Sequence, residues 1–598
     1  STRIGGSLMA LDAGTGWASD YNGLYAGPDT FIGTFGGSPS HNLRAWQKIS
    51  GGQDLHSIPG DPLIASPEGM DYHLRTEQTL GRLLPNGQRT SDDTSSPLLD
   101  AGNPASAAWT NEPAPNGRRV NIGRWGGTVE ASMASTVPWI RTVSFGDAGG
   151  VSNETLNLLW TAGGFSNETA KVEVSLDGGK TWNTTVASGV PITNGTVAWN
   201  TAGLPNSPAG IWRVVCLQQT NVVGQSTQFF SIRNGGLDIY VAPIDVLEPV
   251  YVSAAGLADN WQATSNAPLS SLRTVFSRFD LEPGDRIWVD TGNLVESFPI
   301  QIGMKNSGST LEPVRIIGNT QKPYNGTSLS LSQRSGNVFN ILRAGGVKME
   351  SLSITNAQIG VRSINSGPIA FDRVRVAEMS LNGILASSTP QTMTISKSIL
   401  EQASLEATGA VVNVQHSLIR NGDPGNICIN NGTVNVRNSI LESSGFAGYI
   451  YYYKSATGTL ISDYNNIRVM EGANVAGGGN RPSDRYLIDW QISTVFSNDM
   501  NSFGYEPTFF NREGYDFHLK SEYGRYDPEV SAFVTNDVLT SHLIDLGDPS
   551  TTWSNEPNPN GGRVNVGLYG GTDQASKSPG QGALVPLTMS DGGTVRGE

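Results

Sequence analysis

Charged residues and cysteine are both scarce in this chain. Only 15% of its 598 residues are Asp, Glu, Lys or Arg, and the formal net charge is -14. A polar, acidic chain without a basic stripe argues against nucleic acid or an anionic membrane as a partner. The two cysteines, Cys216 and Cys428, are far apart and form no CxxC pair. This argues against a disulfide scaffold and against a zinc site.

Long hydrophobic runs and common catalytic motifs are also missing. No apolar stretch approaches the length of a membrane span, and no signal peptide opens the sequence, so we expect any export signal to lie outside it. The sequence contains no G-x-S-x-G and no H-E-x-x-H. Gly179-Lys180-Thr181 imitates the end of a phosphate-binding loop, but Val174 stands where that loop needs glycine. We therefore expect no bound cofactor.

One long passage occurs twice, about 444 residues apart. Asn111-Glu112-Pro113 and a Gly-Gly-Thr at 126–128 return as Asn555-Glu556-Pro557 and a Gly-Gly-Thr at 570–572. The chain is about one and a third copies of a long unit, and we expect it to be a piece of a longer tandem array. The repeated glycine pairs indicate a tight turn with a packing requirement.

A histidine also repeats in register, as His73 and His518. No second histidine or cysteine repeats beside it, so a catalytic pair is not indicated. We interpret both as hydrogen-bonded structural residues.

A short apolar pattern recurs between about residues 345 and 465. Each repeat alternates like a short strand with one apolar face and is bounded by Gly, Asn and Ser turns. The five repeats are 22, 24, 19 and 22 residues apart and begin at Val347, Ile369, Met393, Val412 and Val434. A period of this length made only of strands and turns predicts a parallel β-helix, whose stacked rungs bury a continuous apolar core.

Other parts of the chain follow different patterns. Residues 136–235 contain short strands about 10 to 20 residues apart, which predicts an antiparallel sandwich of immunoglobulin-like type. Leu272, Val275, Phe276 and Phe279 have helical spacing and predict a helix that caps the N-terminal end of the β-helix. The duplicated tail is rich in Pro, Gly and Asn, which predicts an irregular C-terminal cap.

Three stretches carry a resemblance to a known family. They are residues 281–292 (Leu-Glu-Pro-Gly-Asp-Arg-Ile-Trp-Val-Asp-Thr-Gly), the two duplicated tails, and Ser175-x-Asp177-x-Gly179-x-Thr181-Trp182, which also resembles an Asp-box turn. With them, nearly the whole chain resembles the units of very large bacterial extracellular proteins that alternate right-handed parallel β-helix segments with immunoglobulin-like modules. The resemblance implies an all-β fold and an extracellular or cell-surface location. It does not specify an activity, because this fold hosts many.

These observations divide the chain into six expected segments. Residues 1–76 are the final rungs of a preceding β-helix, 77–135 an irregular cap or linker, 136–235 the sandwich, 236–520 a β-helix with its N-terminal cap near 269–280, 521–580 a second cap or linker, and 581–598 the first strand of a further sandwich.

The β-helix also offers candidate site residues. Aligning the rungs places two polar columns side by side on its outer face: Glu350, Asp372, Ser396, Gln415 and Arg437, then Ser351, Arg373, Lys397, His416 and Asn438. The carboxylates could hold Ca²⁺ against a uronate, and an Arg or Lys could take the proton α to its carboxyl group. Such columns are also the ordinary solvated face of a solenoid.

The residues expected to contact a glycan are Asp372, Arg373, Lys397, His416, Tyr451 and Tyr453. The two tyrosines belong to an aromatic run that can stack on sugar rings, although alternate members must point into the core.

Our leading hypothesis is a non-enzymatic structural or adhesive segment of a giant secreted or cell-surface protein. Neighbouring copies of the repeat are the expected partners, because a tandem of rigid rods gives reach and repeated valency. Binding or lyase cleavage of an acidic polysaccharide is the alternative.

Overall fold

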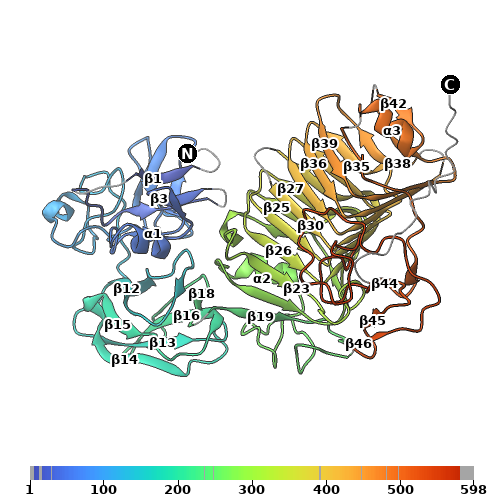
Figure 1. Cartoon of the computed structure of the whole chain (residues 1–598). Coiled ribbons are helices and arrows are strands. Elements are labelled where there is room, and N and C mark those ends of the chain that lie inside the picture. The colour runs from blue at the N-terminus through green and yellow to red at the C-terminus, as the bar shows by residue number, and fades with distance from the viewer. Residues whose placement is uncertain are drawn as a thin grey trace. The chain divides into compact units, whose positions relative to one another are not determined.

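The computed structural model describes residues 6–12, 16–27, 30–234, 236–246, 248–388, 392–445, 448–479, 481–495 and 497–579. The chain forms two compact units (Figure 1). Unit 1 contains residues up to Leu237 with Asp259–Ala263 and Ser277–Asp280, and unit 2 contains the remainder. The strand expected at 581–598 lies outside the described residues.

Unit 1 begins with short parallel ladders and a helix. β1 pairs with β3 and β2 with β5, each in parallel. The elements up to residue 135 are β1 (Ser7–Leu11), β2 (Gly23–Leu24), β3 (Phe31–Phe35), β4 (Ser38–Ser40), α1 (Leu43–Ile49), β5 (Ile58–Pro59), β6 (Ile64–Ser66), β7 (Asp71–Leu74), β8 (Arg82–Leu83), β9 (Arg89–Thr90) and the 3-10 helix η1 (Ala107–Asn111).

The rest of unit 1 is a β-sandwich. One sheet has the order β10 (Trp139–Thr142), β12 (Thr155–Gly163), β15 (Thr196–Asn200). The other has the order β11 (Gly150–Val151), β18 (Phe230–Ile232), β16 (Ser207–Cys216), β13 (Thr169–Ser175), β14 (Thr184–Pro191), with β17 (Val223–Gln225) also paired to β16 and η2 (Ile192–Asn194) after β14.

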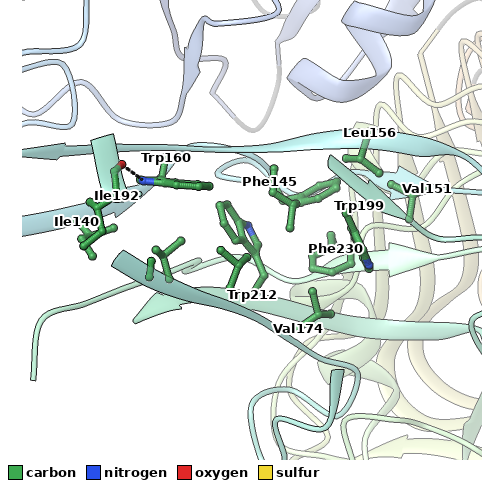
Figure 2. Packing of buried hydrophobic residues seen from close by; sticks show 14 of the residues in the cluster. Ile140, Phe145, Val151, Leu156, Trp160, Val174, Ile192, Trp199, Trp212 and Phe230 are labelled. Carbon is green, nitrogen blue, oxygen red and sulfur yellow. Dashed lines mark hydrogen bonds between the residues drawn. The ribbon is translucent and has the colours of Figure 1, made fainter. Parts of the chain in front are cut away.

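The sandwich has an apolar core of its own. Figure 2 shows Trp160, Trp199, Trp212, Phe145 and Phe230 packed between the sheets. Every buried residue of this cluster lies between residues 140 and 232. The chain here therefore carries its own core, while its assignment to the immunoglobulin-like type stays a prediction.

The Asp-box stretch forms a turn at the end of β13. The Asp177 carboxylate accepts hydrogen bonds from the Ser175 hydroxyl at 2.6 Å and the Thr181 backbone N–H at 2.9 Å. This is the turn role that the sequence predicts.

Unit 2 is a parallel β-helix, which confirms the fold class (Figure 1). A nine-stranded parallel sheet runs along one face. In order it contains β19 (Asp238–Val241), β20 (Arg286–Val289), β23 (Val314–Ile317), β26 (Val347–Glu350), β28 (Ile369–Asp372), β30 (Thr392–Ser396), β33 (Val411–Gln415), β36 (Thr433–Arg437) and β39 (Thr459–Asp463).

The other strands of the rungs form a 15-stranded sheet that bends around the core. It contains β21 (Gly292–Glu296), β22 (Ile300–Ile302), β24 (Thr327–Leu331), β25 (Asn337–Leu342), β27 (Ser353–Ile364), β29 (Arg375–Ser387), β31 (Ile399–Glu401), β32 (Ser404–Thr408), β34 (Leu418–Arg420), β35 (Gly425–Asn430), β37 (Ile440–Ser444), β38 (Tyr449–Tyr453), β40 (Asn466–Met470), β41 (Asn474–Gly478) and β42 (Arg481–Asp484).

Helices and short hairpins make up the remaining elements, and α2 lies mostly in unit 2. The helix predicted near 269–280 is present as α2 (Leu272–Arg278), with Leu272, Val275 and Phe276 buried. The remaining elements are η3 (Met304–Asn306), α3 (Leu487–Ser493), β43 (Phe509–Asn511), β44 (Asp516–Leu519), β45 (Arg525–Asp527) and β46 (Ala532–Val534). The segment boundaries of the sequence analysis stay a prediction.

From β26 onward, each rung turns its first corner through one left-handed residue. The residue that follows each strand from β26 to β39 in the nine-stranded sheet has φ between 48° and 56°; these residues are Ser351, Arg373, Lys397, His416, Asn438 and Tyr464. A side chain in this conformation costs roughly 1–2 kcal/mol. The backbone hydrogen bonds between rungs offset that cost, since the N–H of each corner residue from Ser351 to His416 donates to the next rung.

A buried carboxylate closes the C-terminal end of the β-helix. Asp499 accepts hydrogen bonds from the hydroxyls of Ser462 and Ser502, each at 2.7 Å, and from the indole N–H of Trp490 on α3 at 2.9 Å. In unit 1, Asp54 accepts the equivalent bonds from Ser19, Ser57 and Trp46. The sequence duplication is therefore a duplication of buried polar contacts.

The repeated Asn-Glu-Pro tail is folded around its glutamate. Glu556 accepts hydrogen bonds from the backbone N–H groups of Asn565 at 2.8 Å and Gly571 at 2.7 Å, and Glu112 makes the same pair in unit 1. A Cβ on Gly570 would lie 2.0 Å from the Asn565 carbonyl oxygen. The repeated glycine pair thus meets the predicted packing requirement.

The repeated histidines are buried and paired with carboxylates, which fits the predicted structural role. In β7, Nδ1 of His73 lies 2.6 Å from the Asp71 carboxylate, and in β44, Nδ1 of His518 lies 2.5 Å from Asp516.

Glu556 generates a pH prediction. Burial raises the pKa of Glu556 to about 7, although the N–H groups of Gly571 and Asn565 lower it. The pKa of Glu556 is higher in the folded state than in the unfolded state, so protonated Glu556 stabilises the fold. This contribution to the free energy of unfolding is fully present below the unfolded-state pKa and is lost as pH rises through about 7. We expect unit 2 to lose stability in chemical denaturation between about pH 5 and about pH 8, by at most roughly 3 kcal/mol.

Glu556→Gln is expected to remove most of this pH dependence, because the amide cannot ionise. Glu513→Gln, at an exposed position, is the matched control and should leave it unchanged. An unaltered pH profile in Glu556→Gln would contradict the assignment.

Candidate functional site

Two polar columns run along the first corner of the β-helix. Glu350, Asp372, Ser396, Gln415 and Arg437 pair in register from β26 to β36. The corner residues Ser351, Arg373, Lys397, His416 and Asn438 follow them one by one. The columns predicted from the spacing are therefore present, with neighbouring rungs about 4.8 Å apart.

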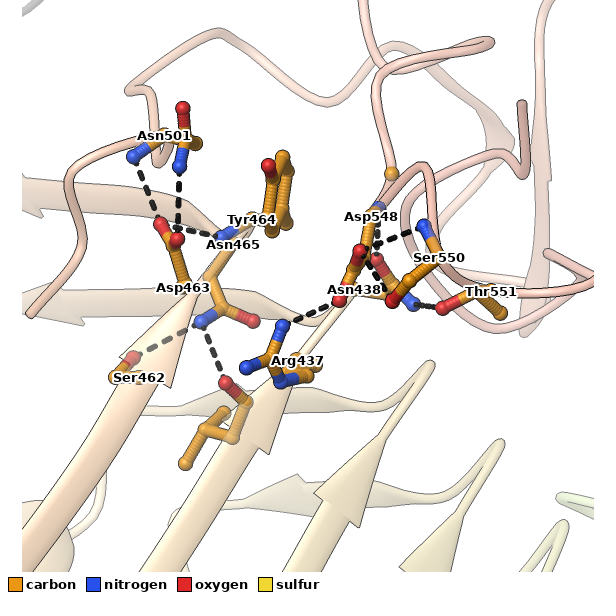
Figure 3. A network of polar contacts seen from close by, with 12 residues as sticks. Arg437, Asn438, Ser462, Asp463, Tyr464, Asn465, Asn501, Asp548, Ser550 and Thr551 are labelled. Carbon is orange, nitrogen blue, oxygen red and sulfur yellow. Dashed lines mark hydrogen bonds and ion pairs between the residues drawn. The ribbon is translucent and has the colours of Figure 1, made fainter.

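The C-terminal tail covers one end of these columns. The Asn438 side chain accepts a hydrogen bond from the Asp548 N–H at 2.7 Å and donates one to Thr551 at 3.1 Å. The Gly567 N–H donates to the Asn438 carbonyl at 2.9 Å, and Arg437 forms an ion pair with Asp548 (Figure 3). These two column residues thus hold the tail in place.

His416 lies beneath the same tail and is not available to a ligand. It is only 6% exposed, and a Cβ on Gly570 would lie 2.6 Å from its Nδ1 atom. Burial, together with the positive charge of Lys397, lowers the pKa of His416 to about 4. The expectation that His416 contacts a glycan is therefore wrong, because the tail buries the neutral imidazole.

The uncovered part of the columns opens into a groove. Asp372, Arg373 and Lys397 line a cavity of about 450 Å³. We call it the corner groove. Its remaining lining residues are Tyr324 and, from the tail, Asn555, Leu568, Tyr569, Gly571, Thr572, Asp573 and Gln574.

The corner groove carries charges of both signs. Arg373 lies 3.5 Å from the Asp372 carboxylate, which also accepts a hydrogen bond from Ser396 at 3.4 Å. Lys397 forms no ion pair with any residue in the part of the chain that the structure describes. Tyr324 donates to the Lys397 carbonyl at 2.7 Å and fixes the backbone there. A bound anion can therefore pair with Lys397 without displacing a carboxylate of the protein.

The other carboxylate of the column is occupied. Arg315 and Lys348 lie 2.6 and 2.7 Å from Glu350. Burial raises the pKa of Glu350, but the hydrogen bonds from these two cations outweigh it and the pKa is lowered. Among the described residues there is no group of three or more His, Cys, Asp or Glu side chains that could hold a metal ion.

Tyr451 and Tyr453 lie far along the rungs from the corner groove, at the end of the β-helix. Tyr451 is fully buried, with its hydroxyl 2.7 Å from Ser462 and its ring 5.6 Å from that of Trp490. Tyr453 packs against the same indole and beneath Arg481. Tyr451 cannot contact a glycan, because its position in β38 points into the core.

The tail residues of the corner groove were missed by sequence reasoning. Asn555, Tyr569, Asp573 and Gln574 lie in an irregular segment more than 150 residues after the rungs that they face. The repetition of the Asn-Glu-Pro and Gly-Gly-Thr motifs was the one available signal, and it indicated a cap rather than a groove wall.

Comparisons with known proteins give little further information. No family model and no curated protein matches the chain. A pectate lyase Pel9A structure matches with 12% identity and a TM-score of 0.31, covering 56% of this chain and 96% of its own. An alginate lyase from Paenibacillus sp. str. FPU-7 matches with 11% identity and a TM-score of 0.24, covering 35% of this chain and 95% of its own. Similarity at this level does not indicate what this chain binds.

Within the described ranges, none of the helices combines the length and apolarity that crossing a bilayer requires.

The burial of Tyr451 generates a stability prediction. Tyr451→Ala is expected to destabilise unit 2 by about 3–5 kcal/mol in chemical denaturation, because it leaves a large cavity. Tyr451→Phe removes only the hydroxyl contact and should cost about 1 kcal/mol. Tyr523→Ala, at an exposed tyrosine, is the control and should change stability by less than about 0.5 kcal/mol. A Tyr451→Ala protein as stable as the control would place this side chain outside the core.

Proposed function

We propose that this chain is a non-enzymatic, structural and adhesive segment of a bacterial extracellular or cell-surface protein, and that it holds an acidic polysaccharide in the corner groove. The observation that carries the proposal is the unpaired ammonium group of Lys397 in a groove that the tail leaves open. A carboxylate on a sugar ring can pair with Lys397, and sugar hydroxyls can bond to Asp372, Asn555 and Gln574.

Binding without cleavage is the simpler use of these groups. The single histidine of the columns is buried under the tail, so it cannot exchange a proton with a bound ligand. Arg373 and Asp372 are engaged with one another. A lyase that acts on the same polysaccharide is the second candidate, because Lys397 lines the groove and its neutral amine can take the proton α to a uronate carboxyl group.

Repetition supports the structural part of the proposal. Two copies of one tail, each folded around a buried glutamate, occur in a single chain. Rigid β-helices joined by sandwiches would present the groove at regular intervals, and weak binding at each groove would add through multivalency. Neighbouring copies of the repeat, associated end to end in a fibre, are the proposed partners besides the polysaccharide.

Lys397→Ala is expected to weaken binding of polygalacturonate or alginate about tenfold, because it removes the one charge that meets the sugar carboxylate. Binding by the native chain should fall with added salt and should be lost with the carboxyl-reduced polymer. Isothermal titration on the full chain measures all three effects. Lys305→Ala, on η3 and outside the groove, is the matched control.

Equal affinity for the native and the carboxyl-reduced polymer would refute recognition of acidic sugars. Release of unsaturated uronate by the native chain, lost in Lys397→Ala, would replace the binding proposal with the lyase.

A further inference from the structure

The cap helix α3 presents an apolar face to solvent. Ile488, Ile492 and Val495 follow at intervals of four and three residues, which places them on one side of the helix and its end. They are 38%, 58% and 84% exposed. The opposite side carries Leu487 and Trp490, which are buried against the β-helix. The core of unit 2 therefore does not account for the three apolar side chains.

The duplicate of this helix shows what such a face does. α1 has the same scaffold, since Trp46 donates to Asp54 as Trp490 donates to Asp499. In the alignment of the two helices, Arg44 and Lys48 stand where α3 has Ile488 and Ile492, and Gly51 stands where Val495 stands.

In unit 1 this face of α1 is an interface with the β-sandwich. Arg44 and Lys48 both form ion pairs with Glu154, which precedes β12, and Lys48 also donates to the Gly150 carbonyl at 3.3 Å. The Leu43 N–H donates to Asp147 at 2.8 Å. The face that α3 leaves exposed is, in its twin, partly covered by a sandwich: Arg44 is half-buried there, while Lys48 and Gly51 stay exposed.

Val495 gives a second reason to regard the α3 face as a binding surface. It follows the helix cap with φ of 52°, where α1 has Gly51 with φ of 73°. Glycine is favoured at this position because a β-branched residue is strained there. Val495 is 84% exposed and gains no burial among the described residues that would offset this strain, so the apolar side chain is retained at a cost to folding.

We propose that the apolar face of α3, formed by Ile488, Ile492 and Val495, docks a β-sandwich module of the kind formed by residues 136–235. The module carries an apolar residue in place of Glu154. A carboxylate at that position would be desolvated against two isoleucines with no cation to pair with, which is unfavourable. The two copies of the unit thus use one helix face with two chemistries, ionic in unit 1 and apolar in unit 2. The proposal is independent of polysaccharide binding.

The test uses the full chain to residue 579, followed by a second copy of residues 136–235, which have a core of their own. Four versions of this protein are compared. The added sandwich is either native or carries Glu154→Leu, and each of these is combined either with native α3 or with α3 carrying Ile488→Arg/Ile492→Lys. Hydrogen exchange of the backbone amides of α3 reports docking. We expect at least tenfold slower exchange in the two matched pairs, Glu154→Leu with native α3 and native Glu154 with the substituted α3, than in the two mismatched pairs.

Equal exchange rates in all four versions would overturn the proposal. So would concentration-dependent dimerisation of the unextended chain that Ile488→Arg/Ile492→Lys abolishes, because it would assign the face to a second α3. Val495→Gly is a further variant: it should raise the denaturation midpoint of the unextended chain, and it should speed exchange in the matched apolar pair.

Discussion

The hydrogen bonds between successive rungs are the constraint on which unit 2 depends. They fix one register from β19 to β39, so a residue type at one place in a rung becomes a column along the whole face. They also hold the corner residues in a left-handed conformation that those side chains would otherwise avoid. A chain poor in charge and rich in Gly, Asn and Ser suits this design, because corners and columns need compact polar side chains more than ions.

Duplication has preserved the interior and changed the surface. The buried carboxylates Asp54 and Asp499 keep the same donors, since losing one would leave several polar groups unpaired in the core. The sides of α1 and α3 that face away from their own cores have diverged from two cations to two isoleucines. Under the proposed docking, the module that covers α3 carries a matching apolar residue in place of Glu154.

The sequence predicted the periodic part of the molecule well. The spacing of the repeats alone predicted five rungs and their register, because each further repeat checks the alignment of the others. The helical spacing of apolar residues predicted α2. Local patterns could not show what a distant segment covers: burial of His416 depends on Gly570, far along the chain. The predicted glycan contact of Tyr451 was wrong for a different reason. In a run of adjacent tyrosines, only the register of the strand decides which ring points inward.

The contrast between rung and tail also locates where specificity can arise. From β26 to β39 every rung turns the same kind of backbone corner, so the backbone alone marks out no rung as a site. The tail distinguishes the rungs. It pairs with Arg437, hydrogen-bonds to Asn438 and buries His416, and it leaves Asp372, Arg373 and Lys397 open to the groove. It then supplies the facing wall of the groove from residues outside the rungs. A change in the irregular tail would therefore alter the corner groove without disturbing the ladder, whereas a change in the rungs would disturb both.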